Sequence, residues 1–449
     1  MTSFPVVGRL PDALSSTVAF SGCHAGRHEP TWAQQEGLML QRSARFLERK
    51  GSHARFDGPL DEAAALPDVL RAIGLAVEHY DSLRTRYRSD ADDGVVAIVT
   101  GDGQITVRVY EADGTEVSQM AAWVIEALSG ESFGEDDLPL RAAVITDRGV
   151  PRRLVLYVHH LSADGAALSL LHERIRRLSA DPRAGFPAAW QPCEIAEFEA
   201  SEAGRRQARV ADERLRDLWR EIAAFGPVAR PGTGAPHGFV AATLRSRAVA
   251  AAADALARRY ATSVPSVITA GFAAALGRLI ERDRYALLLA AGNRGRPELR
   301  CSVANLSQLV PAVVDVRPAD FREVCRSTAL AALHAYRNGH HDPSRHRESI
   351  TLAGLPLDPA LPYLVNSRND VAATPATTSP NQQTPRVREL RAQSAVEVLD
   401  LGEDPQYFSL GLSVFGADHL MMMGDRAAFS AAELGTLQNS LESVLVEAM

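Results

Sequence analysis

Apolar residues recur along this chain at two different spacings. Five stretches have an apolar position every three or four residues, which predicts helices: 30–50, 62–80, 117–128, 166–178 and 264–280. Between and after them lie short runs of mostly apolar residues that predict strands: 95–100, 105–110, 140–145, 154–158, 285–290, 310–316, 363–366, 407–415 and 419–424. Strands that alternate with amphipathic helices predict an α/β protein.

Three further stretches are defined by composition. The turn-former Gly101-Asp102-Gly103 separates the first two strand runs, so we expect those runs to form an antiparallel hairpin. The charged stretch 194–223 has a helical pattern. The polar run 368–388 is rich in Ser, Thr, Pro and Asn, and we expect it to be a long loop.

The length of the chain bounds its domain organisation. At 449 residues it exceeds the size at which one hydrophobic core usually keeps growing, so we expect two packed units of about 200 residues each. We place the units at residues 1–183 and 184–449, with the charged helix leading the second. With 46% apolar and 23% charged residues the composition is globular, and a net charge of -7 argues against a general nucleic-acid binder.

The remaining composition narrows the chemistry. Four widely spaced cysteines form no C-x-x-C pair, and the three histidines within residues 340–346 have no second ligand cluster near them, so we predict no metal site. The N-terminus lacks a signal-peptide pattern, and no apolar run reaches the roughly 20 residues that span a bilayer. These patterns predict a cytoplasmic protein without a membrane partner.

The segment with the clearest chemistry is His159-His160-Leu161-Ser162-Ala163-Asp164-Gly165. It joins a predicted strand to a predicted helix, a position where side chains and backbone amides commonly face a cleft. A neutral imidazole there could take the proton from an amine or hydroxyl that attacks an acyl carbonyl. Adjacent residues leaving a strand point in opposite directions, so the spacing leaves open which of His159 and His160 faces the cleft.

Asp164 and Gly165 each allow two interpretations. Asp164 could orient a catalytic histidine, or it could turn away from the cleft and pair with an arginine to hold the loop. We favour the structural interpretation, with Arg141 on the preceding strand as the partner. Gly165 could offer an unobstructed backbone amide to an oxyanion, or it could serve only the turn.

These residues resemble the HHxxxDG motif of the condensation-domain family, which comprises the condensation domains of nonribosomal peptide synthetases and the related chloramphenicol-acetyltransferase-like acyltransferases. Residues 79–87 are similar to the family's H-E-x-L-R-T-R-F segment, with Tyr87 in the last position, and residues 138–141 are similar to P-L-x-R. Residues 292–298 resemble G-R-x-R-P-E. The chain departs from the family at Gln308, where many members have asparagine, and residues 31–34 match the opening motif only loosely.

The resemblance implies a fold and a set of residue roles. The fold would be two chloramphenicol-acetyltransferase-like α/β units that form a V-shaped pseudodimer with a central tunnel. His160 would be the principal catalytic residue. We place His159 and Gly165 with it as catalytic, and Asp164 and Arg141 as structural support of the site.

The resemblance also implies an activity. The chain would be a free-standing acyltransferase of natural-product biosynthesis that condenses a phosphopantetheine-linked acyl thioester with an amine or alcohol, forming an amide or ester. The donor would arrive on an acyl or peptidyl carrier protein or as a coenzyme A thioester, and no cofactor would be tightly bound. Two alternatives stay open: an epimerase of the same fold, and a non-catalytic recruitment protein of a biosynthetic assembly.

Overall fold

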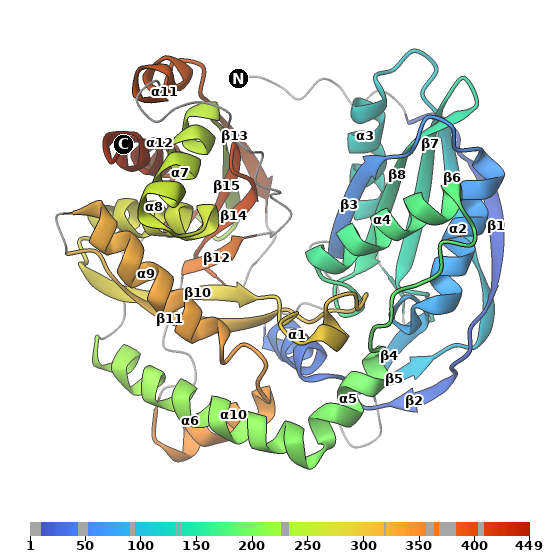
Figure 1. The fold of residues 1–449 in the computed structure, drawn as a ribbon, viewed down its shortest axis with the longest axis horizontal. Coiled ribbons are helices and arrows are strands. Elements are labelled where there is room, and N and C mark those ends of the chain that lie inside the picture. The colour runs from blue at the N-terminus through green and yellow to red at the C-terminus, as the bar shows by residue number, and fades with distance from the viewer. Residues whose placement is uncertain are drawn as a thin grey trace. The chain divides into compact units, whose positions relative to one another are not determined.

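The chain is arranged as two compact units in a computed structural model (Figure 1). The structure describes residues 10–43, 53–89, 95–131, 133–134, 136–225, 233–317, 320–355, 363–367, 383–402 and 408–449. Unit 1 comprises residues 1–205 and 293–306, and unit 2 comprises residues 206–292 and 307–449. The division differs from the boundary expected at residue 183, because residues 184–205 and the segment 293–306 both belong to unit 1.

Unit 1 is built on a five-stranded sheet with the order β1-β6-β7-β8-β3, in which only β6 and β7 are parallel. A smaller sheet has the order β2-β5-β4. The elements are β1 (Leu14–Ser21), β2 (Gly26–His28), α1 (Trp32–Ser43), β3 (His53–Pro59), α2 (Leu66–His79), β4 (Thr85–Ser89), β5 (Val95–Val99), β6 (Asp102–Glu111), α3 (Val117–Ser129), β7 (Leu140–Asp147), β8 (Val150–His159), α4 (Gly165–Ala180) and α5 (Pro192–Ala200).

Strand β7 of this sheet is apolar on both faces. Leu140, Ala142 and Val144 belong to the core that also contains α2 and α4, whereas Ala143 and Ile145 belong to the core that contains α3 (Figure 1). A strand covered on both sides reads as an almost continuous apolar run, so its sequence does not reveal which helix faces which residue. Which residues can pair in the candidate site depends on which face of β7 each side chain occupies.

The expected hairpin between the first two strand runs is wrong. Strand β5 pairs with β2 and β4 in the small sheet, whereas β6 pairs with β1 and β7 in the large one. Gly101 and Gly103 lie where the chain changes sheet. A Cβ on Gly103 would lie 2.7 Å from the ring of Phe20, so this glycine allows a close approach rather than a hairpin turn.

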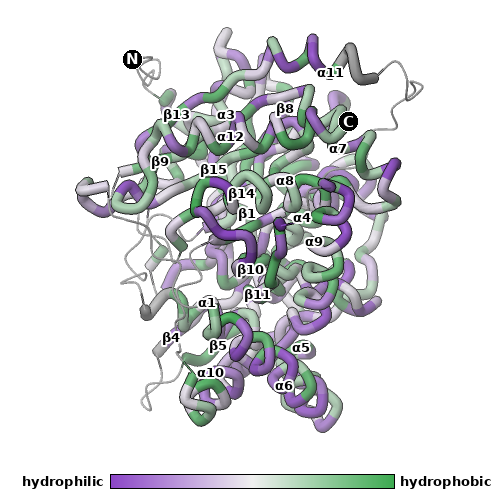
Figure 2. The backbone as a smooth tube through the Cα atoms, turned by 90° about the vertical axis from the view of Figure 1, so that its left-hand side faces the viewer, coloured by the Kyte–Doolittle hydropathy of each residue, from purple (hydrophilic) through white to green (hydrophobic). Residues whose placement is uncertain are grey.

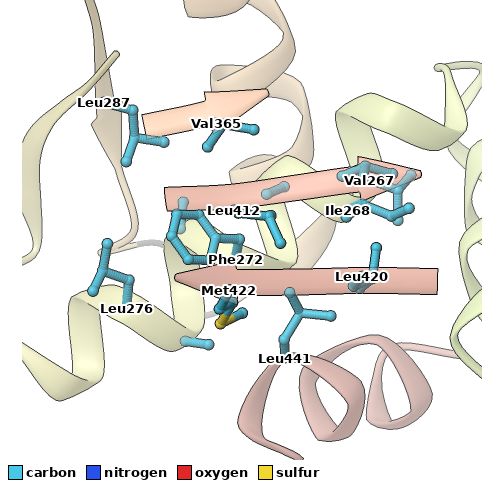
Figure 3. Packing of buried hydrophobic residues seen from close by; sticks show 14 of the residues in the cluster. Val267, Ile268, Phe272, Leu276, Leu287, Val365, Leu412, Leu420, Met422 and Leu441 are labelled. Atoms are coloured by element: carbon cyan, nitrogen blue, oxygen red, sulfur yellow. The ribbon is translucent and has the colours of Figure 1, made fainter. Parts of the chain in front are cut away.

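Unit 2 is built on a seven-stranded sheet with the order β11-β10-β12-β14-β15-β9-β13. Its main core packs helices against one face of this sheet, and Figure 3 shows Phe272, Leu412 and Met422 at its centre. The elements are α6 (Glu202–Ala224), which begins in unit 1, β9 (Phe239–Arg245), α7 (Arg247–Tyr260), α8 (Val264–Leu279), β10 (Arg284–Ala291), β11 (Gln308–Asp315), α9 (Phe321–Tyr336), α10 (Pro343–Leu352), β12 (Tyr363–Ser367), α11 (Gln383–Arg391), β13 (Ala395–Gly402), β14 (Leu410–Gly416), β15 (His419–Asp425) and α12 (Ala431–Glu447).

The charged stretch 194–223 forms helices as predicted, divided between α5 and α6. Along α6 hydrophobic residues recur at helical spacing among hydrophilic ones (Figure 2). The run 368–388 was expected to be a loop: residues 368–382 lie outside the described residues, and residue 383 begins α11. No single helix in the described parts of the chain is long and apolar enough to cross a membrane, and α7 and α8 reach that length and composition only jointly, across a 107° bend.

Candidate active site

The double-histidine segment lies on the connection between β8 and α4 of unit 1. Strand β8 ends at His159, whose backbone N–H donates to the carbonyl of Pro139 at 2.9 Å. The chain then turns, and the N–H of Ser162 donates to the carbonyl of His159 at 2.9 Å. Helix α4 begins at Gly165. The strand-to-helix placement expected from the sequence is therefore confirmed.

Asp164 is the N-cap of α4 and the most heavily bonded group of the segment. Its side chain is 2% exposed and accepts from the backbone N–H of Ala167 at 2.8 Å and of Leu306 at 3.0 Å. Both terminal nitrogens of Arg294 donate to it, at 2.8 and 2.9 Å. Burial by itself raises the pKa of Asp164, but the charge and hydrogen bonds of Arg294 outweigh burial, so its pKa lies below the ordinary value.

The expectation that Asp164 pairs with Arg141 is wrong, since Arg294 is the ion-pair partner of this carboxylate. Arg141 forms its ion pairs with Glu131 and Asp137 instead. The physical reason is the alternation of side chains along β7: Arg141 points to the face covered by α3, whereas Asp164 begins α4 on the opposite face.

Arg294 was not among the partners expected from the sequence, although residues 292–298 resemble a segment of the family. The guanidinium of Arg294 also donates to the carbonyl of Ala304 at 3.1 Å, within the same 293–306 segment. Asn293, which has a left-handed φ of 51°, donates from its side chain to the carbonyl of Leu306 at 2.8 Å. The segment thus forms a folded loop around the arginine that binds Asp164.

His159 lies in an aromatic cluster on the α3 face. Its ring centroid is 5.5 Å from that of His53 and 5.9 Å from that of Phe133. Burial, with smaller contributions from the charges of His53 and His160, lowers the pKa of His159 to about 3. The imidazole is therefore neutral near pH 7, and its Nδ1 accepts the backbone N–H of Leu161 at 3.3 Å.

His160 and Gly165 are more exposed than the buried Asp164 between them. His160 has an exposed side chain on the turn directly after β8. Gly165 is half-buried in the first turn of α4, where backbone amides have no partner within the helix and the helix dipole is positive. The imidazole of His160 is therefore exposed on a β8–α4 connection that is held in place by the buried hydrogen bonds of Asp164.

Residues of the other segments that resemble the family have supporting positions. Arg84 is fully buried and its guanidinium donates to Asp81 at 2.6 Å and to the backbone carbonyl of Val77 at 2.9 Å. Ser82 donates to the carbonyl of Val303 at 2.5 Å and so fixes the 293–306 segment to the short 3-10 helix Asp81–Arg84 that follows α2. These groups hold the surroundings of the site, and they present no reactive atom.

The histidines of residues 340–346 have structural contacts in unit 2. His341 is 4% exposed, and burial lowers its pKa to about 3. His346 bonds Asp212 through Nδ1 at 3.2 Å and accepts the indole N–H of Trp219 through Nε2 at 2.6 Å. Among the described residues, no group of three or more His, Cys, Asp or Glu side chains is arranged to hold a metal ion.

Comparison with known proteins identifies the family. The sequence model of the Condensation domain matches residues 53–343. The hybrid PKS-NRPS synthetase tasS of Hapsidospora irregularis is 25% identical over 331 residues, which cover 70% of this chain but only 8% of the synthetase. The chain thus spans less than a tenth of the length of this curated relative.

Solved structures show the same fold. The condensation domain that mediates chain release from the enacyloxin polyketide synthase is 19% identical, with a TM-score of 0.71, over 93% of this chain and 82% of that one. The SgcC5 protein of Streptomyces globisporus is 16% identical, with a TM-score of 0.70, over 94% and 98% of the two chains. The mixed α/β fold, with one large sheet in each unit, agrees with two chloramphenicol-acetyltransferase-like units. The chain belongs to the condensation domain family of acyltransferases in natural-product biosynthesis.

Proposed function

We propose that this protein transfers an acyl group from a phosphopantetheine thioester to an amine or alcohol, and that His160 is the general base. The observation that carries the proposal is the contrast within the segment: His160 is exposed, whereas Asp164 and the loop around it are held by buried hydrogen bonds. A general base must be accessible to the nucleophile and held in a fixed position.

The reaction follows from these positions. Neutral His160 takes a proton from the amine or hydroxyl as its nitrogen or oxygen bonds to the thioester carbonyl carbon. The carbonyl oxygen gains negative charge, which the backbone amide of Gly165 at the start of α4 stabilises. When the carbon–sulfur bond breaks, the electron pair leaves with sulfur, and protonated His160 returns the proton to the thiolate. The products are an amide or ester and a free thiol.

In this proposal His159 and Asp164 hold the backbone of the segment in place around His160. His159 stays neutral and uses its Nδ1 to hold the N–H of Leu161, so we assign it a positioning role within the catalytic segment. Asp164 does not serve as the proton acceptor in this proposal, because its buried carboxylate already accepts hydrogen bonds from Arg294 and from the backbone N–H groups of Ala167 and Leu306. The acyl donor we propose is carried by an acyl or peptidyl carrier protein or by coenzyme A.

Allele replacement in the native host tests the proposal. Strains carrying His160→Ala, a clean deletion, or the control His237→Ala are compared with wild type by mass spectrometry of their metabolites. His237 is suited to this control because its side chain is 89% exposed in unit 2. We expect the deletion and His160→Ala to lose the same product and His237→Ala to keep it. Loss in the deletion alone would reject catalysis and favour a recruitment protein.

A further inference from the structure

Leu161, the residue that follows His160, is hydrogen-bonded through both its backbone N–H and its backbone carbonyl. The carbonyl of Leu161 accepts the side-chain amide of Gln34 at 3.2 Å and the hydroxyl of Tyr87 at 3.1 Å. The N–H of Leu161 donates to Nδ1 of His159 at 3.3 Å. Fixing both groups of one residue fixes the backbone on which the preceding side chain stands.

The two donors to Leu161 are themselves held in place. Gln34 is fully buried near the start of α1, its Oε1 accepts the backbone N–H of Thr31 at 2.9 Å, and its Nε2 donates to the Tyr87 hydroxyl at 2.8 Å. This pattern sets which end of the amide faces the turn. Burial raises the pKa of Tyr87, so its hydroxyl remains a protonated donor.

The arrangement joins three parts of unit 1 that are distant in sequence. Gln34 comes from α1, Tyr87 from β4, and Leu161 from the turn after β8. Helix α1 packs closely there, because a Cβ on Gly37 would lie 2.9 Å from the side chain of Leu161. The family segment that residues 79–87 resemble ends in phenylalanine, which has no hydroxyl to donate at this position.

We propose that Gln34 and Tyr87 are positioning residues that hold His160 for catalysis by clamping the carbonyl of Leu161. The inference rests on the proposed function of His160 for its catalytic meaning, but the clamp itself is a property of the fold. Removing one donor should let the turn open more often while leaving the rest of unit 1 folded.

The test compares Tyr87→Phe with Tyr285→Phe. Each change removes one buried hydroxyl that donates to a backbone carbonyl, since Tyr285 donates to Ala273 at 2.6 Å in unit 2. The imidazole signal of His160 is recorded by NMR of protein labelled with carbon-13 in its histidines and is assigned by its loss in His160→Gln. Amide exchange of a peptide covering residues 159–164 is measured by mass spectrometry on the same proteins.

In Tyr87→Phe we expect the His160 signal to shift or broaden and the amides of the turn to exchange about fivefold faster, since one net hydrogen bond is worth about that factor. Gln34→Met should give the same two changes, and Tyr285→Phe neither. Unchanged His160 signal and exchange in both Tyr87→Phe and Gln34→Met would overturn the clamp.

The host product separates this inference from the proposed function. With both correct, the Tyr87→Phe allele should lower the rate of product formation about fivefold, and the Tyr285→Phe allele should keep it. A product that survives His160→Ala rejects the proposed function whatever the NMR signal shows. A Tyr87→Phe allele with the wild-type rate, in a host where His160→Ala abolishes the product, rejects the positioning role.

Discussion

The bond between Asp164 and Arg294 yields a quantitative prediction. Asp164→Ala removes the acceptor of two backbone amides and leaves a guanidinium that is only 15% exposed without its carboxylate. Breaking a buried ion pair by removing one partner costs about 3–5 kcal/mol, and losing an N-cap costs about 1 kcal/mol. We therefore expect a loss of about 4–6 kcal/mol in the free energy of unfolding of unit 1.

A double-mutant cycle isolates the pair. Arg294→Ala should cost about 3 kcal/mol, because Asp164 keeps its two amide donors but remains buried. The double variant should cost clearly less than the sum of the single losses, with a coupling energy of about 2 kcal/mol. Arg141→Ala is the control: its partners Glu131 and Asp137 are 36% and 52% exposed, so it should cost about 1 kcal/mol or less.

Urea denaturation provides the measurement. Three of the four tryptophans, Trp32, Trp123 and Trp190, lie in unit 1, so their fluorescence follows the unit that carries the change. Hydrogen exchange of the backbone amides of α4 measures the same loss of stability at the helix that Asp164 caps. Equal losses in Arg141→Ala and Asp164→Ala, or strictly additive losses in the cycle, would refute the assigned partner.

The pair also fixes a pH dependence. The pKa of Asp164 is lower in the folded protein than the value of about 3.9 in an unfolded chain. The stability it contributes is therefore fully present above about pH 4 and is lost as the pH falls through the folded pKa. The stability difference between wild type and Asp164→Asn should shrink below about pH 4, whereas a constant difference would contradict this linkage.

Two further changes test the buried groups. Gly22→Ala should lower the free energy of unfolding of unit 1 by about 3 kcal/mol, measured by urea denaturation, because the new Cβ would lie 2.1 Å from Cζ of Arg84, whose buried hydrogen bonds prevent it from moving. Between about pH 6.5 and pH 4 the unfolded chain binds a proton at residue 341 and the folded protein does not, because the folded pKa of His341 is about 3. His341→Leu should therefore reduce the slope of unfolding free energy against pH in this range by about 1.4 kcal/mol per pH unit. An unchanged slope in pH-dependent thermal unfolding would contradict the second expectation.

Local sequence determined much of unit 1. Strand β8, helix α4 and the turn between them were predictable, because an apolar run ends at a polar segment with an N-capping aspartate and the helical period begins after it. Helices α2 and α3 followed from the same period. The His159–Gly165 segment, which resembles the HHxxxDG motif, lies between β8 and α4, so the family was accessible from the sequence.

Pairing between strands was not determined locally. The Gly101–Gly103 turn looked like a hairpin turn, but β5 and β6 are both apolar enough to join either sheet. In the folded chain β6 pairs with β1, where Gly103 lies against the ring of Phe20, and β5 joins the small sheet. Helix α11 was not predicted either, since its mostly polar sequence has no apolar residues at helical spacing.

The partners of the site were decided only by the tertiary structure. Arg141 and Arg294 are both plausible partners for Asp164 by charge. Arg141 lies on the face of β7 that α3 covers, whereas the folded 293–306 segment places Arg294 against Asp164. Strand β7 is apolar on both faces, so its sequence does not reveal which of its faces α3 covers. The contacts of Gln34 and Tyr87 with Leu161 likewise join residues 127 and 74 positions apart, a closeness that only the packed chain creates.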